Sequence, residues 1–149
     1  MTMPLRPEAD ALRIGMLAGI FTRADVVTWA DLAIAELDKP CEQLIDLSTS
    51  ENLDGSAFAA LLGAIPGQSD LALTKKVLLA RLGAKMAKGA ELSAIVPSLA
   101  QLGDLVAFSD EEKKTVARLG ATAPADELRR EAVQFLAAYD MAGQTHLLD

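Results

Sequence analysis

The sequence predicts an all-α protein, a compact bundle or short solenoid-like stack of seven to eight short helices without a sheet, in one domain spanning residues 1–149. Ala occurs 27 times and Leu 24 times, together about a third of the chain, and both residues favour helices. Aromatic residues, which favour strands, make up only 4%. No stretch alternates apolar and polar residues for long enough to predict a strand.

The first two helices are marked by residues typical of helix ends. A helix is expected from about Pro7 to Ala18, because proline suits a first helical turn and Gly19 follows the last. Thr22 and the aspartate three residues later form a variant of the capping box. A second helix with one apolar face is therefore expected to begin there and to end at about Leu37.

The next two helices are expected to be short. Residues 38–40 (Asp-Lys-Pro) are predicted to cap and open a third helix that runs through Leu47. After a polar loop, Asn52 or Asp54 is expected to start a fourth helix. The Pro-Gly pair at 66–67 is expected to end it.

The fifth helix is expected to be the central, buried one. It begins at Ser69 or Asp70, ends at Gly89 and is apolar nearly all round for its first three turns. A sixth segment has apolar residues at helical spacing over 92–102, but Pro97 lies inside it. That helix is therefore either kinked at the proline or divided into two.

The last two helices follow a second capping box and a loop. Ser109 with Glu112 is expected to start a seventh helix that runs to Leu119. The final helix is expected from about Pro124 to about Ala142, with one apolar face.

Two segments of the chain are similar at an offset of 45 residues. Residues 19–25 align with residues 64–70, and the helices expected after them share an Ala-x-Leu sequence. A period of this size is typical of helical-repeat solenoids. The alternative is a chance match between two helix–turn–helix segments of a chain rich in Ala and Leu.

Charge is distributed unevenly. The formal net charge is −7; residues 1–74 hold 4 Lys or Arg against 11 Asp or Glu, while residues 75–149 hold 10 of each. This asymmetry predicts a charged partner, but not nucleic acid, because negative charge repels phosphate backbones. Charged or turn residues interrupt every apolar stretch before the ~20 residues that a membrane span needs. The high mean hydropathy of +0.24 therefore predicts a generous core or a homo-oligomer interface.

Residues that usually carry catalysis or bind metals are scarce. The only histidine, His146, lies near the C-terminus, where chains fray, so multi-histidine metal sites and Ser–His or Cys–His pairs are not expected. The only cysteine, Cys41, fits a reducing cytoplasm and is predicted to be structural. The glycines form neither of the common nucleotide-binding loops. We therefore predict no catalytic residue, metal or cofactor, with a carboxylate pair between helices as the alternative.

Acidic residues form the pattern that most favours a binding surface. They gather around the second and third expected helices, in the series Asp25, Asp31, Glu36, Asp38, Glu42, Asp46, Glu51 and Asp54. Asp38, Glu42 and Asp46 are four apart and are expected to stack on one face of the third helix, at a cost of a few tenths of a kcal/mol per pair that a cationic partner would offset. The alternative is a solvated face whose first acids are favoured by the helix dipole.

Trp29 and a group of basic residues complete the candidate site. Trp29 adjoins the apolar face of the second helix, so it is expected in the core or at its edge. At the edge, between Asp25 and Asp31, it would be an interface anchor. Basic residues on the fifth helix are expected to pair with the acidic half, within or between subunits, rather than bind phosphate; they are Lys75, Lys76, Arg81, Lys85 and Lys88.

Part of the chain resembles a family of small bacterial proteins. The stretch 19–31 (GIFTRADVVTWAD), followed by Asp-Lys-Pro at 38–40 and Leu-Ile-Asp-Leu at 44–47, is similar to a pattern in small helical proteins of uncharacterised or toxin-immunity type. The resemblance covers roughly 30 residues and contains no catalytic motif. It implies a helical protein that neutralises a toxin by binding it.

These observations favour binding over catalysis. The first hypothesis is a non-catalytic, cytoplasmic bacterial protein-binding domain, an immunity-type inhibitor whose acidic N-terminal half occludes a basic protein partner. Its candidate binding residues are Asp25, Trp29, Asp31, Glu36, Asp38, Glu42 and Asp46. The alternatives are a structural or regulatory helical module that acts through dimerisation, and an enzyme with a carboxylate-lined pocket between helices.

Overall fold

A computed structural model of the chain describes residues 3–50, 52–119, 125–139, 141 and 145–148. These residues form eight α-helices and a short 3₁₀ turn: α1 (Leu5–Leu17), α2 (Arg23–Glu36), α3 (Glu42–Ser48), α4 (Gly55–Gly63), α5 (Leu71–Ala87), α6 (Leu92–Leu105), α7 (Asp110–Leu119), α8 (Ala125–Ala137) and η1 (His146–Leu148). No described residue lies in a strand, and no helix that they form is long and apolar enough to cross a membrane. The all-α prediction is confirmed.

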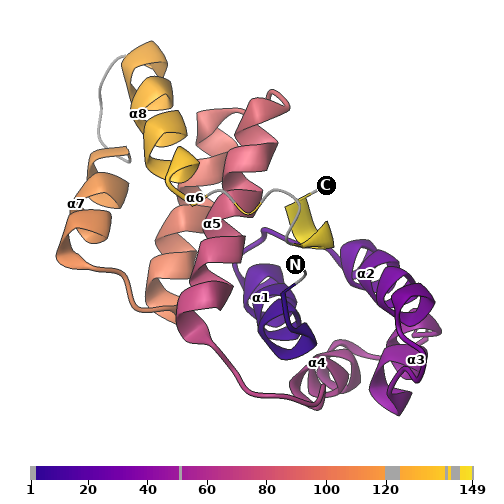
Figure 1. The fold of residues 1–149 in the computed structure, drawn as a ribbon. Helices are drawn as coiled ribbons and strands as arrows, with labels where there is room; N and C mark the ends of the chain where they lie inside the picture. The colour runs from indigo at the N-terminus through magenta and orange to yellow at the C-terminus, as the bar shows by residue number, and fades with distance from the viewer. Residues whose placement is uncertain (1–2, 51, 120–124, 140, 142–144, 149) are drawn as a thin grey trace.

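Helix α5 is the central helix, as predicted. Figure 1 shows it in the middle of the molecule, with α1–α4 on one side and α7 and α8 on the other. It packs against α1, α6, α8 and η1. Its Val77, Leu78, Leu79 and Leu82 are fully buried, so it supplies a large part of the core. This burial follows from the helix being apolar on most of its circumference.

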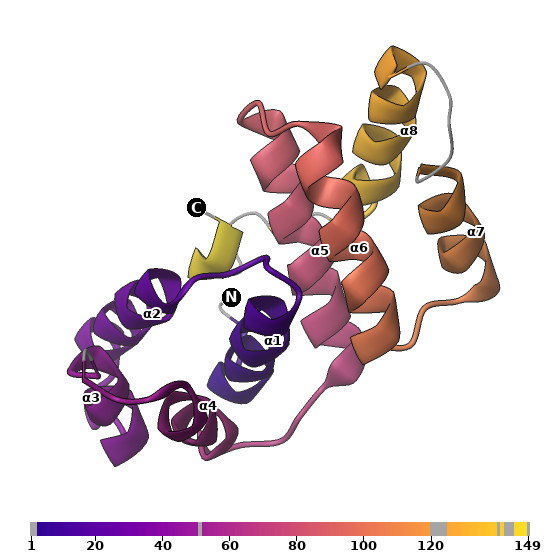
Figure 2. The ribbon, with the colours of Figure 1, turned by 180° about the vertical axis from the view of Figure 1, so that it is seen from behind.

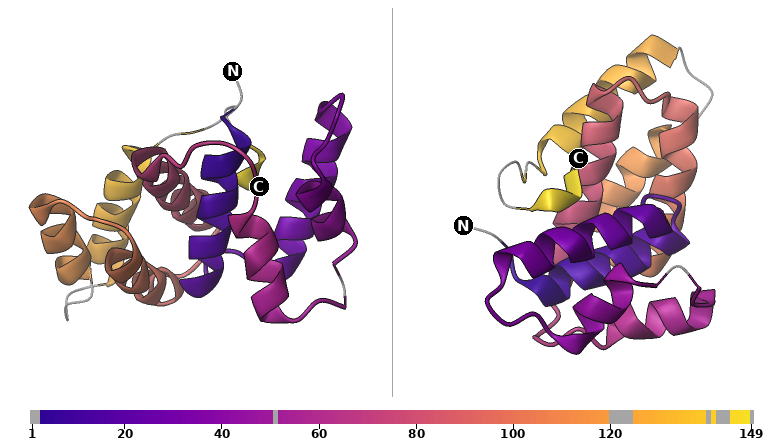
Figure 3. Two further views of the ribbon diagram at one scale, coloured as in Figure 1. Left: turned by 90° about the horizontal axis from the view of Figure 1, so that it is seen from below. Right: turned by 90° about the vertical axis from the view of Figure 1, so that its right-hand side faces the viewer.

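Helix α1 joins the two sides of the molecule. It packs against α5 and α6 on one side and against α4 on the other, and the view from behind in Figure 2 shows it between them. Helix α2 packs against α3, and α3 against α4. Figure 3 shows α2 and α3 at the edge of the molecule that lies away from α7 and α8. The second and third helices thus form an outer layer with much of its surface in solvent.

The predicted helix-end motifs are present. Thr22 Oγ1 accepts a hydrogen bond from the backbone N–H of Asp25 (3.2 Å), and the N–H of Thr22 donates to the Asp25 carboxylate (2.8 Å). Ser109 and Glu112 form the same pair of bonds, at 3.2 and 2.8 Å. Gly19 follows α1 with a φ of 74°, a left-handed conformation that favours glycine. These three predictions are confirmed.

Helix α3 begins later than predicted. Residues 38–40 lie outside any helix, and α3 begins at Glu42 with Cys41 at its N-cap. Both Leu37 and Cys41 have extended backbone, with ψ of 136° and 158°. Asp38 and Lys39 form a bend, and proline disfavours helical backbone in the residue before it, so a helix does not begin at Asp38. The prediction that Asp38 caps and joins the third helix is therefore wrong.

Three other expectations concern the second half of the chain. Pro97 does not divide its helix, because α6 runs through it as one element. The predicted ends of the last helix, Pro124 and Ala142, lie outside the described residues, which place α8 between them. Near the C-terminus, η1 packs against α5 and α2, and Leu147 is buried.

The similarity at an offset of 45 residues does not join equivalent positions. It aligns Asp25 with Asp70. Asp25 is the third residue of α2, whereas Asp70 is the N-cap of α5. The two aspartates thus occupy different positions relative to the start of their helices. A helical repeat in this register gains no support.

Arg6 ties α1 to the connection between α4 and α5. Its guanidinium donates to the carbonyl oxygens of Gly63 (2.5 Å) and Ile65 (3.0 Å), and it lies 3.2 Å from the carboxylate of Asp10. Asp10 is 3% exposed and also accepts a hydrogen bond from Ser69 Oγ (2.7 Å). A buried carboxylate is tolerable when it is paired and hydrogen-bonded in this way.

A glycine allows the close approach of α1 to α5. A Cβ atom on Gly15 would lie 2.4 Å from Cδ2 of Phe21 and 2.9 Å from Cδ2 of Leu78. Both distances are shorter than carbon atoms can approach without repulsion, so a side chain here would displace Phe21 and Leu78 from their packed positions.

Candidate functional site

The acidic residues of α2, α3 and their connection are largely exposed. We call residues 31–46 the acidic segment. It contains five carboxylates against one basic residue, Lys39. All five side chains are exposed; they are Asp31, Glu36, Asp38, Glu42 and Asp46. Among the described residues, no ion pair involves Asp31, Asp38, Glu42 or Asp46. These four carboxylates therefore present uncompensated negative charge to solvent.

The structure places these carboxylates on three elements. Glu42 and Asp46 lie one turn apart on α3, as predicted, whereas Asp38 lies in the connection before that helix. Asp31 and Glu36 lie on α2. Because α2 packs against α3, the acidic segment forms one region at the edge of the molecule (Figure 3).

Asp54 and Glu51, two further acids of the series, lie outside the acidic segment. Asp54 caps α4 by accepting a hydrogen bond from the N–H of Ala57 (2.7 Å). Glu51 lies outside the described residues.

Asp25 belongs to the fold rather than to the exposed segment. Besides capping α2, its carboxylate lies 3.7 Å from the guanidinium of Arg81 on α5. The guanidinium lies over the ring of Phe21, 5.1 Å from its centroid. Lys85, one turn further along α5, donates to the carbonyl of Ile20 (2.7 Å). Burial and the neighbouring positive charge of Arg81 lower the pKa of Lys85. The negative charge of Asp25 raises it, but by less. The prediction that basic residues of α5 pair with the acidic half is thus confirmed for Arg81 but wrong for Lys75, which pairs with Glu112 of the C-terminal half.

Trp29 lies in the core. Its side chain is 2% exposed and shares the buried face of α2 with Val26, Ala30 and Ala33. An indole at this depth does not reach the surface, so the role of interface anchor is wrong and the core-packing alternative is correct. The indole continues the apolar face of the helix, which explains why two flanking acids do not bring it to the surface.

A pocket opens beside the acidic segment, and we call it the α3–α4 pocket. Its volume is about 570 Å³, and it is lined by Asp46, Thr49, Leu53, Ala57, Ala60, Leu61 and Ala64. Asp46 and Thr49 come from the end of α3, and the others come from α4 and the residues on either side of it. The pocket therefore combines apolar walls with one carboxylate, within the size range of ligand sites.

The pocket exists because α4 has two apolar faces. One face, with Phe58 and Leu62, is buried in the core. The second carries the four α4-side lining residues at i, i+3, i+4 and i+7, which are Ala57, Ala60, Leu61 and Ala64. Small side chains on this face leave the space open. Sequence reasoning missed the pocket, although this second apolar stripe was a signal that could have indicated it.

Arg23 holds the loop that forms one wall of the α3–α4 pocket. Its guanidinium donates to the carbonyls of Ser50 (2.9 Å) and Leu53. It also lies over the ring of Phe58, 4.4 Å from the centroid. A cation–π contact and two carbonyl bonds from one side chain join α2, the loop and α4. The pocket is thus built into the fold.

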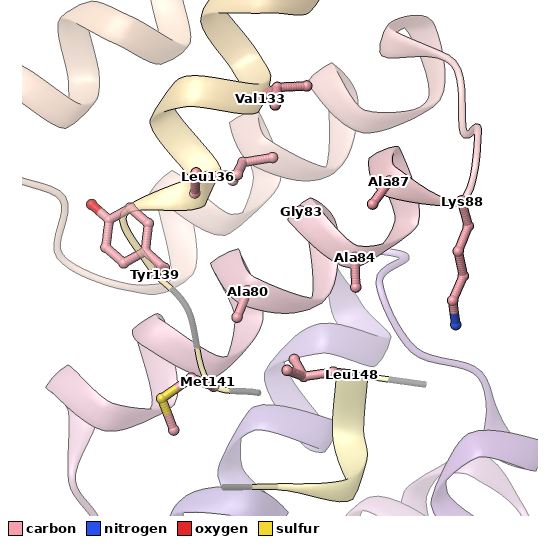
Figure 4. Close-up of a pocket in the computed structure, with 11 residues that line it drawn as sticks. Ala80, Gly83, Ala84, Ala87, Lys88, Val133, Leu136, Tyr139, Met141 and Leu148 are labelled. Atoms are coloured by element: carbon pink, nitrogen blue, oxygen red, sulfur yellow. The ribbon is translucent and has the colours of Figure 1, made fainter. Parts of the chain in front are cut away.

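A second pocket lies between α5 and α8, and Figure 4 shows its lining side chains. Its volume is about 550 Å³, and it is lined by Ala80, Gly83, Ala84, Ala87, Lys88, Val133, Leu136, Ala137, Tyr139, Met141 and Leu148. Of these described residues Lys88 alone is charged, and in Figure 4 its side chain extends away from the apolar group. This pocket offers an apolar surface without a convergent polar group.

Glu112 lies at the centre of a buried polar cluster outside the acidic segment. It is 8% exposed, and its carboxylate accepts hydrogen bonds from Lys75 Nζ (2.9 Å), the N–H of Ser109 (2.8 Å) and the hydroxyl of Tyr139. Burial raises the pKa of Glu112, but the bonds from Tyr139, Ser109 and Lys75 together lower it to about 2. Burial and the same carboxylate raise the pKa of Tyr139. The cluster joins α5, α7 and the end of α8.

Carboxylates do not converge in these pockets. A third pocket, of about 510 Å³, is lined by Asp126, Arg129, Arg130, Val133 and Gln134. Each of the three contains at most one acidic residue. In the part of the chain that the structure describes, no three His, Cys, Asp or Glu side chains are placed to hold a metal ion together. The hypothesis of a carboxylate pair between helices gains no support from them.

Comparisons of the chain with protein-family models, with curated proteins and with solved structures find no match. Function is therefore argued from the surface and its chemistry.

Proposed function

We propose that this protein is a non-catalytic protein-binding domain whose acidic segment docks a basic protein partner. It would act by occlusion, as an immunity-type inhibitor does when it covers a toxin. The observation that carries the proposal is a run of exposed carboxylates, four of them without an ion pair among the described residues, beside a preformed pocket.

Charge supports a basic partner. The acidic segment has five carboxylates and one lysine within 31–46, whereas α5 directs Arg81 and Lys85 into contacts inside the chain. Uncompensated charge of one sign attracts the opposite sign over a Debye length and raises the rate of encounter. Binding through this segment is therefore expected to be fast at low salt and to weaken as salt rises.

Apolar side chains in the same segment support a protein partner over a small cation. Leu32, Leu37 and Ile45 are large apolar residues with exposed fractions of 40%, 39% and 47%. A protein interface combines buried apolar contacts with a charged rim. The acidic segment contains both kinds of side chain.

Dimerisation is the second candidate function. Leu17 and Leu71 are the most exposed of the large apolar side chains described, at 62% and 66%, and both lie outside the acidic segment. A second copy could cover them. Sedimentation equilibrium over a range of concentrations tests this candidate, because a strict monomer would contradict it.

The proposed function is tested with a fluorescent, arginine-containing basic peptide and an acidic peptide of the same length. The basic peptide is expected to bind the full chain, and more weakly as NaCl rises from about 0.01 M to about 0.15 M, where the Debye length falls from about 30 to about 8 Å. The double substitution Asp31→Lys with Glu42→Lys is expected to abolish binding.

The matched control is Asp104→Lys with Glu111→Lys. Both residues are exposed acids on helices of the C-terminal half, and Glu111 lies in the first turn of α7 as Glu42 does in α3. The control changes net charge equally, so it is expected to retain most of the binding. Equal loss in both variants, or binding that is indifferent to salt, would show that the acidic segment is not the docking surface.

A further inference from the structure

We propose that the α3–α4 pocket is an arginine subsite: it receives one arginine side chain of the basic partner, with the stem against α4 and the guanidinium on Asp46. This inference rests on the proposed function, because it names the residue by which that partner is recognised. It goes beyond that function in assigning the α3–α4 pocket as a site that recognises a guanidinium together with its apolar stem.

The walls suit the stem of an arginine. Leu53 and Leu61 are half-buried, so part of each side chain is available to a ligand. Ala57, Ala60 and Ala64 form a shallow, apolar strip along one face of α4. Arginine places its three methylene groups along apolar surface while its charged end stays in contact with water.

The head of the pocket suits a cation. Of the described residues that line it, Asp46 alone is charged, and its exposed carboxylate has no ion pair among the described residues. Asp46 lies in the last turn of α3, where the helix dipole adds negative potential. A guanidinium can donate two parallel hydrogen bonds to one carboxylate, which an ammonium cannot do.

The competing occupant is an uncharged apolar side chain, and the surrounding charge disfavours it. Such a side chain would fill the walls but would remove water from Asp46 without replacing its hydrogen bonds. Desolvating a carboxylate without a partner is unfavourable. The net charge of the acidic segment adds to the preference for a cation, because Glu42 lies one turn from Asp46.

NMR titration of the ¹⁵N-labelled full chain with N-acetylarginine methylamide tests the subsite. Saturable shift changes are expected at the amides of the pocket residues. N-acetylnorleucine methylamide supplies a stem without charge, and methylguanidinium supplies the charge without a stem. Each is expected to cause smaller changes at the same concentration. If either one matches the arginine derivative, the pocket does not recognise the combination and the inference is overturned.

Two pairs of variants localise the effect. Ala60→Leu fills the pocket without changing charge and is expected to abolish the saturable shifts, whereas Ala59→Leu, on the neighbouring exposed position of α4 outside the pocket, should retain them. Asp46→Asn is expected to weaken binding about two- to fivefold, as for an exposed ion pair. Asp31→Asn, on α2, should leave it nearly unchanged. Retention of the shifts in Ala60→Leu would refute the subsite.

The basic peptide separates failure of this inference from failure of the proposed function. If the peptide binds Ala60→Leu as tightly as wild type and with the same salt dependence, the acidic segment binds basic partners but the arginine subsite is refuted. If peptide binding is indifferent to salt and to Asp31→Lys with Glu42→Lys, the proposed function fails, whatever the arginine derivative does.

Discussion

Replacing Glu112 with glutamine is expected to destabilise the protein in a pH-dependent way. The carboxylate of Glu112 joins three elements, because its donors come from α5, from the start of α7 and from Tyr139 after α8. Glutamine keeps the size of the side chain but removes its charge. The loss is therefore that of a charge-assisted cluster rather than of packing.

The magnitude follows from the pKa of Glu112, which falls from an ordinary 4.5 to about 2 in the folded chain. At about 1.4 kcal/mol for each factor of ten, this difference stabilises the fold by about 3 kcal/mol at pH 7. Because the folded-state pKa is the lower one, the stabilisation is complete above pH 4.5 and is lost as the pH falls towards 2. At pH 3 about 1.4 kcal/mol should remain.

Urea unfolding followed by far-UV circular dichroism at pH 7 and pH 3 measures this difference. Glu112→Gln is expected to be less stable than wild type by about 3 kcal/mol at pH 7, with a melting temperature lower by about 6–12 °C, and by less than half as much free energy at pH 3. The exposed neighbour Glu111→Gln should stay within about 0.5 kcal/mol of wild type. A deficit of the same size at both pH values would refute the argument.

Three further predictions concern packing and the loop beside the pocket. Gly15→Ala should cost about 1–3 kcal/mol in thermal unfolding, whereas Gly63→Ala, whose Cβ meets nothing within 4 Å, should be neutral or stabilising; the reverse order would contradict the close approach of α1 to α5. The fluorescence of Trp29 should be blue-shifted, weakly quenched by acrylamide and unchanged by the basic peptide; strong quenching would contradict its burial. Arg23→Met should cost about 2–3 kcal/mol in urea unfolding and weaken binding of N-acetylarginine methylamide, since the loop loses two carbonyl bonds. Unchanged affinity in that variant would show that Arg23 does not shape the pocket.

The parts of the fold that could be predicted from the sequence are those set by local chemistry. The capping boxes at Thr22 and Ser109 and the glycine turn after α1 depend on residues within a few positions of each other. The central place of α5 could be predicted because an apolar circumference has few alternatives to burial.

The errors arose where two local signals competed. Asp38 is a good helix cap, but the proline two residues later disfavours helical backbone at Lys39, so no helix begins at Asp38 and α3 starts at Glu42. Trp29 lies between acids in the sequence and beside an apolar face, and burial of the large indole prevailed. Spacing alone does not show which of two such effects is larger.

The α3–α4 pocket could not be predicted, because it depends on contacts between distant residues. Its wall at Leu53 is positioned by Arg23, 30 residues earlier in the chain. Nothing near either residue in the sequence indicates that a guanidinium on α2 bonds to that loop. The second apolar stripe of α4 was visible, but whether another helix covers it is decided by tertiary packing.

The acidic residues of the N-terminal half form two groups in the structure, those that make contacts within the fold and those that are exposed in the acidic segment. Asp10 pairs with Arg6, Asp25 pairs with Arg81, and Asp54 and Asp70 cap helices. These charges support folding. In the acidic segment, Glu42 and Asp46 repel each other at a cost of a few tenths of a kcal/mol, with no compensating ion pair among the described residues. A charge excess that folding does not use, placed at the edge of the molecule beside an open pocket, is the strongest reason to look for a basic partner there.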